Sequence, residues 1–168
     1  MNIEYIAGLF DGEGSVRITF EKRRNKPYVF KMKNPTRGNF QMGASVANTH
    51  LYVLRKLKEK FGGRLSADSK RKDKPHWKNC FTWSIASKSA ENFLRAIEPF
   101  VIIKKNHIKI ALKFQEGMGE FRATGQKRLS EEEFNRRKKF KEELNLINAR
   151  GNNYKYYTRA ELNLLVKR

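Results

Sequence analysis

Two carboxylates stand close together near the N-terminus, in the segment IAGLFDGEGS, where Asp11 and Glu13 are separated and followed by glycines. The preceding apolar residues have the spacing of one helix face, so both acids fall at the expected end of a helix. A helix C-terminus carries partial negative charge and disfavours further acids. A cation would remove this conflict, and carboxylate and carbonyl oxygens are the ligands that magnesium prefers. Such an ion promotes hydrolysis of a phosphodiester, although the same residues are also typical of a simple helix end and turn.

The chain is strongly basic, with 37 Lys and Arg against 17 Asp and Glu and a formal net charge of +20 in 168 residues. Such a charge destabilises a compact protein unless a polyanion is its partner, and nucleic acid is the leading candidate. The longest apolar run, Phe100 to Ile103, is far below the roughly 18 residues of a membrane-spanning helix. The N-terminus also lacks the pattern of a signal peptide. We therefore expect an intracellular, nucleic-acid-binding protein without a membrane segment.

Other catalytic chemistries find little support in the sequence. The single cysteine, Cys80, excludes an internal disulfide and a cysteine-based zinc site. His50, His76 and His107 are scattered without metal-ligand spacing, so we interpret each as an ordinary surface or DNA-facing residue. No glycine-rich phosphate loop or serine-hydrolase elbow is present.

The alternation of apolar and polar residues predicts an α+β fold, in which one antiparallel sheet carries helices on one face. One helix is expected to begin after Ser87 or Ser89 as its N-cap. The expected order is helix 3–11, strands 15–21 and 40–46, helix 51–61, strands 64–70 and 77–87, and helices 90–100 and 108–114.

The C-terminal region, 121–168, is basic and follows the predicted core, 1–120, without a Pro/Ser-rich linker. The pattern Ser130-x-x-Glu133 predicts a capping box that opens a further helix. We therefore expect this region to be a helical extension of the same domain. The role of the tyrosine-rich segment 154–157 stays open between gripping DNA and packing.

The outer faces of the four predicted strands hold many of the side chains that read base edges in a DNA groove. A solvated sheet face is equally polar, and the net charge is what favours DNA contact. The expected DNA-binding residues are Arg17, Thr19, Glu21, Gln41, Ser45, Arg64, Ser66, Asp68, Lys70, Lys78 and Thr82.

The segment IAGLFDGEG resembles the motif that defines the LAGLIDADG homing endonucleases, with identity at Ala7, Gly8, Asp11 and Gly14. The resemblance covers roughly residues 3–115 and implies an αββαββα fold with a four-stranded antiparallel DNA-binding saddle. A single copy of the motif implies a homodimer, in which the motif helices of two subunits pack together. The expected interface residues are Ile3, Ile6, Ala7 and Gly8.

The resemblance also implies roles for individual residues. By motif position, Glu13 is expected to bind magnesium or manganese with the Gly12 carbonyl beside it, and Asp11 to support the junction. Asp is commoner than Glu at the position of Glu13. Lys104, with Lys105 as the alternative, is expected near the scissile phosphate, and Asn48 is expected to hold a water molecule. For Lys104 and Asn48 a solvated surface position is the competing interpretation.

The resemblance implies a site-specific endonuclease that hydrolyses both strands of a long pseudo-palindromic DNA site and leaves 3′ overhangs. This is the activity of an intron homing endonuclease. Two alternatives share the fold: an RNA-binding intron maturase, and a catalytically inactive DNA-binding regulator. The presence of both Asp11 and Glu13 argues against the regulator.

Overall fold

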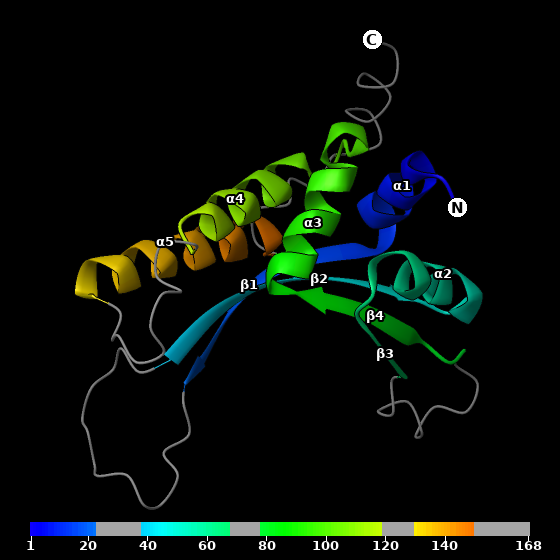
Figure 1. Ribbon diagram of the computed structural model, residues 1–168, viewed down its shortest axis with the longest axis horizontal. Helices are drawn as coiled ribbons and strands as arrows, with labels where there is room; N and C mark the ends of the chain where they lie inside the picture. Colours follow the sequence, from blue (N-terminus) through cyan, green and yellow to red (C-terminus); the bar gives the residue numbers. More distant parts are fainter. Residues whose placement is uncertain (23–37, 68–77, 119–129, 150–168) are drawn as a thin grey trace, which may run out of the picture.

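The computed structural model describes residues 1–22, 38–67, 78–118 and 130–149. Their order confirms the predicted αββαββα arrangement, followed by two further helices (Figure 1). The elements are α1 (Ile3–Glu13), β1 (Gly14–Lys22), β2 (Gly38–Asn48), α2 (Leu51–Phe61), β3 (Arg64–Ala67), β4 (Phe81–Ala86), α3 (Ser87–Ile97), the 3-10 turn η2 (Glu98–Phe100), α4 (Lys105–Glu116) and α5 (Glu131–Asn148).

The four strands form one antiparallel sheet in the order β1-β2-β4-β3. Its register places Val16, Ala44 and Ile85 in one row, and all three are buried on the face that packs against the helices. Because successive side chains point to opposite faces, Arg17 and its neighbours at every second position lie on the other face. The helices lie on one side of the sheet in Figure 1, so this second face is open.

Asn2 is the N-cap of helix α1, and its side-chain oxygen accepts a hydrogen bond from the Tyr5 N–H at 3.0 Å. Its buried apolar residues enter the core, where the Phe10 ring packs edge-on against Phe93. The helix runs directly into β1 at Gly14, where a side chain would lie 2.4 Å from the Phe10 carbonyl oxygen. Only glycine therefore fits this junction without rearrangement.

The expected cap of α5 is confirmed at Ser130, whose hydroxyl accepts the Glu133 N–H at 3.2 Å. The Glu133 carboxylate instead pairs with Arg136 and Arg137, so the reciprocal half of the box is replaced by ion pairs. Phe134 packs against the rings of Phe20 and Phe40 from β1 and β2. The first part of α5 thus covers the far end of the β1-β2 pair.

One cap prediction is wrong: α3 begins at Ser87 with Ala86 as its N-cap, and no side chain caps it. Ser87 has a φ of 53°, and its hydroxyl accepts from the Gln41 side chain instead. The strands expected over 64–70 and 77–87 are described over 64–67 and 81–86. Residues 68–77, the boundary near 120 and the tyrosines of 154–157 lie outside the described residues. None of the helices described is long and apolar enough to cross a membrane.

Candidate active site and nucleic-acid interface

Asp11, in the last turn of α1, is held by the backbone that leads into α4. One carboxylate oxygen accepts the N–H groups of Ile102 at 2.7 Å and Ile103 at 3.2 Å, and the other accepts the Lys104 N–H at 3.0 Å. Residues about 90 positions apart in the chain are thereby fixed to each other. Asp11 itself is 9% exposed.

These contacts determine the ionisation of Asp11. Burial alone would raise the pKa of this carboxyl, but the three backbone N–H groups and the positive charge of Lys104 outweigh it and lower the pKa below its ordinary value. Asp11 is therefore an ionised carboxylate with backbone partners on both oxygens, suited to orienting the junction.

Lys104 lies beside the same helix end, and its ammonium group donates to the main-chain oxygen of Asp11. It supplies the positive charge that the C-terminus of α1 lacks, since no basic residue stands in the last turn of that helix. Lys104 therefore offsets part of the negative charge that the acids and the helix dipole place at this end of α1. Lys105, the alternative candidate, is the exposed first residue of α4.

Glu13, the last residue of α1, is exposed and makes no hydrogen bond or ion pair within the described part of the chain. Gly12 is also exposed, and the space around its Cα is open. An exposed carboxylate beside a helix-terminal carbonyl fits a hard cation such as magnesium. No group of three His, Cys, Asp or Glu side chains lies together among the described residues.

Asn48 is the last residue of β2 and lies near the end of α1. Gly14, which follows Glu13, is paired with Val46, two residues before Asn48. The side-chain oxygen of Asn48 accepts the His50 N–H at 2.8 Å and so shapes the entry to α2. Its amide nitrogen is the group that remains to hold a water molecule.

His107, for which the sequence predicted an ordinary surface or DNA-facing residue, is half-buried. Burial and the charge of Lys104 lower the pKa of its ring, against a hydrogen bond to the Ile147 backbone that raises it. The ring nitrogen Nδ1 is buried without a partner in the part of the chain that the structure describes.

The open sheet face carries most of the predicted DNA-binding side chains. Arg17, Glu21, Arg64, Ser66 and Lys78 are exposed, and Thr19, Gln41 and Thr82 are half-buried. Ser45 differs, because it is only 8% exposed and its hydroxyl accepts from Arg17 at 3.4 Å. It supports a neighbour rather than reaching outward. Asp68 and Lys70 lie outside the described residues.

The predicted interface residues on α1 divide into two groups. Ile6 and Ala7 are fully buried in the core of this one chain. Ile3 also packs against that core. Gly8 is exposed, and a side chain added there would meet nothing within 4 Å.

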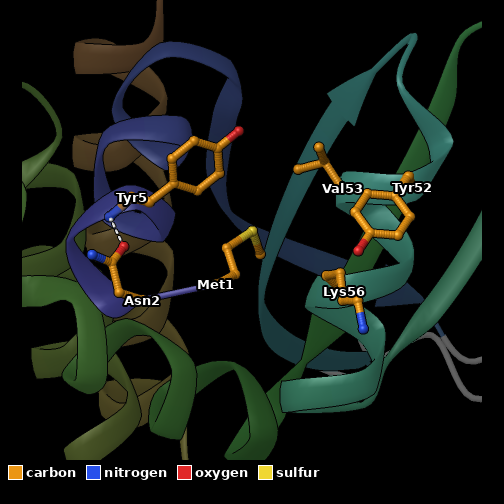
Figure 2. Close-up of a pocket in the computed structure, with 6 residues that line it drawn as sticks. All are labelled: Met1, Asn2, Tyr5, Tyr52, Val53 and Lys56. Carbon is orange, nitrogen blue, oxygen red and sulfur yellow. Dashed lines mark hydrogen bonds between the residues drawn. The ribbon is translucent and has the colours of Figure 1, made fainter.

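Exposed apolar side chains lie beside α1, and the sequence analysis did not identify them. Met1, Tyr5, Tyr52 and Val53 line a groove of about 420 Å³ between the start of α1 and α2, shown in Figure 2. Tyr5 is 52% and Tyr52 63% exposed. At the other end of α1, Ile102 and Ile103, whose N–H groups bind Asp11, are 84% and 72% exposed.

Comparisons with known proteins agree with this architecture. The pattern of the LAGLIDADG endonuclease family matches residues 6–112. The homing endonuclease I-CvuI, solved with its target in the presence of 2 mM Ca, has a TM-score of 0.67 at 12% identity, covering 98% of this chain and 92% of that one. The archaeal intron-encoded homing endonuclease I-Vdi141I, solved with DNA, gives 0.64 at 19% identity, covering 98% and 94%.

A third solved structure is about twice as long. The LAGLIDADG meganuclease I-AabMI, bound to uncleaved DNA, has a TM-score of 0.63 at 15% identity, covering 99% of this chain but 49% of that one. At these identities the likeness shows the fold. A search among curated proteins gave no match.

Proposed function

This chain belongs to the LAGLIDADG endonuclease family, and we propose that it is a homing endonuclease that cuts both strands of a specific DNA site using a divalent metal. The observation that carries the proposal is the junction of α1 and β1. Asp11 is fixed there by three N–H groups, and Glu13 projects into solvent two residues later, where the open sheet face begins. A carboxylate placed in this way has no evident structural role.

Magnesium, or manganese in its place, would be held by the Glu13 carboxylate and the Gly12 carbonyl. When bound, the ion would polarise the scissile phosphate and lower the pKa of a bound water molecule. The ligands that one copy lacks would come from a second copy, the DNA and water. Asp11 keeps the helix end in place through its backbone partners.

Two further residues complete the proposed site. Lys104 holds a positive charge against the end of α1, where a phosphate near Glu13 would be stabilised as negative charge develops in the transition state. Asn48 would orient water through its amide nitrogen. These roles give four proposed active-site residues, Glu13, Asp11, Lys104 and Asn48.

The open sheet face would lie in the major groove of double-stranded DNA, with one subunit on each half of a pseudo-palindromic site. Cutting across the intervening minor groove would leave 3′ overhangs. Basic side chains on this face, such as Arg17 and Arg64, would make the affinity fall steeply with salt. We also assign α5 to the same domain, because Leu144 lies in the common core.

A second copy of this chain is the proposed partner of the exposed face of α1. Gly8 and Gly12, four residues apart, leave open space where two helices can approach closely. The apolar side chains at both ends of α1 would then be covered. The 49% coverage of a longer relative supports this arrangement, since two copies would match its length.

The test is cleavage of DNA. Duplexes bound by the protein are selected from a randomised pool, cloned into a plasmid, and incubated with wild type and Glu13→Gln in magnesium or in a chelator. We expect wild type to cut with magnesium only, and Glu13→Gln to bind without cutting. Glu142→Gln is the matched control, because Glu142 is an exposed carboxylate on α5.

Unchanged cutting by Glu13→Gln would remove the catalytic assignment of Glu13. Binding without cutting by wild type would favour the DNA-binding regulator. Promotion of intron splicing by the protein in the absence of cutting would favour the maturase. A single copy bound to each cut site would contradict the homodimer.

A further inference from the structure

Arg17, in β1, lies flat across the neighbouring strand. It is paired in register with Gly43 of β2, which in turn faces Ala86 of β4. A side chain at Gly43 would lie 3.5 Å from Nε and 3.7 Å from Cγ of Arg17, so the arginine occupies the space above this glycine. The small residues in this row let Arg17 extend over β2 toward β4.

A second arginine approaches the same place from the opposite edge of the sheet. Arg64 begins β3 and is paired with Ser84 of β4. Arg17, Arg64, Ser84 and the Ser89 residue of α3 together line a pocket of about 300 Å³. The residues that line it therefore include two arginines and two serines, which come from β1, β3, β4 and α3.

Among the residues that the structure describes, no acidic side chain in this pocket balances the two arginines. No Asp or Glu lines it, and neither Arg17 nor Arg64 forms a salt bridge within the described residues. Arg17 donates a hydrogen bond to the Ser45 hydroxyl, which is a neutral group. Two arginines and two serines around one pocket offer charged and neutral hydrogen-bond donors to an anion with several acceptor oxygens.

We propose that this pocket binds one phosphate of the DNA backbone, which both Arg17 and Arg64 contact. The proposal rests on the proposed function, and it changes the interpretation of these arginines from reading bases to positioning the DNA. A guanine edge engages one arginine in a bidentate pair, which would leave the second guanidinium without an acceptor. The two non-bridging oxygens of a phosphate can accept from both, and from the serine hydroxyls.

The experiment measures binding to a random-sequence 30-base-pair duplex as a function of salt, without magnesium. Each phosphate contact contributes about 0.9 to the slope of log K against log salt concentration. Replacing both arginines, in Arg17→Ala/Arg64→Ala, is expected to lower the slope by about one, because the two share one phosphate. The double replacement with Lys is expected to keep most of the slope.

The matched control is Arg55→Ala/Lys58→Ala, which removes two exposed cations from α2, on the helical side of the sheet. Its slope is expected to stay as in wild type, and circular dichroism melts verify that every variant is folded. An unchanged slope in the arginine double variant would overturn the pocket, as would a fall of about two, which means two separate phosphates. Failure of wild type to bind the duplex at all would instead overturn the proposed function.

Discussion

Replacement of Asp11 tests whether its backbone contacts hold α1 to α4. Asp11→Ala leaves three N–H groups without their acceptor. A hydrogen bond of this kind contributes about 1 to 3 kcal/mol, and Ile102 and Ile103 are exposed enough for water to replace part of it. At about 1 kcal/mol for each donor, we expect a loss of about 3 kcal/mol in the free energy of unfolding.

Asp11→Asn separates the charge from the geometry. The amide retains one oxygen but places an NH₂ group against the remaining donor, so we expect a loss of about 2 kcal/mol at neutral pH. The pKa of Asp11 is lowered in the folded chain below its ordinary value of 3.8. The stability that the charge contributes is therefore fully present above that ordinary value and is lost as the pH falls through the lower, folded-state pKa.

The measurement is urea unfolding followed by circular dichroism at pH 7 and at pH values from 4 downward, at one protein concentration because association also stabilises the fold. Glu142→Gln, which removes an exposed carboxylate, is the control and is expected to stay within about 0.5 kcal/mol of wild type. A difference between wild type and Asp11→Asn that stays constant from pH 7 to pH 3 would refute the ionised role. An Asp11→Ala variant as stable as the control would refute the contact itself.

Three further predictions concern the same helix and its surroundings. Lys104→Met keeps the backbone N–H and is expected to lower the single-turnover cleavage rate by about 100-fold or more while duplex affinity changes little; an unchanged rate would contradict its role. Gly14→Ala, whose Cβ would lie 2.4 Å from the Phe10 carbonyl oxygen, is expected to cost about 1 to 3 kcal/mol in thermal melts. Gly12→Ala meets nothing within 4 Å and is the control. Gly8→Arg is expected to give folded monomers in sedimentation experiments, and an unchanged mass would place the dimer interface elsewhere.

The strands and most helices followed from the sequence because their signals are local. The alternation around Val16 and around Met42 fixes which face of each strand is buried, whatever the rest of the chain does. The helix pattern of Ile6 and Ala7 was equally clear, but periodicity shows only that one face is apolar. It does not distinguish the core of the same chain from the surface of a partner, and in the single chain both residues lie in the core.

Contacts between distant segments were beyond the sequence. No residue near Asp11 indicates that its carboxylate oxygens accept the N–H groups of residues 102–104. Every residue except proline has a main-chain N–H, so the sequence does not mark which of them will donate to Asp11. The position of Arg17 over Gly43 likewise depends on the register of two strands separated by residues 23–37. Register is set by the whole sheet, and a shift of one residue would move Arg17 to the buried face.

The continuity of α1 and β1 links the proposed chemistry to the proposed recognition. Glu13 ends the helix and Gly14 begins the strand, so no loop separates the proposed metal ligand from Arg17. Four residues of strand span about 13 Å, which is a rigid distance between the group that cuts and the group that contacts the backbone. Asp11 fixes the helix side of this segment, and pairing of Gly14 with Val46 fixes the strand side. The proposed position of the cut relative to the bound phosphate therefore depends on one short stretch of chain. One residue inserted between Gly14 and Arg17 would turn the Arg17 side chain to the buried face of the sheet.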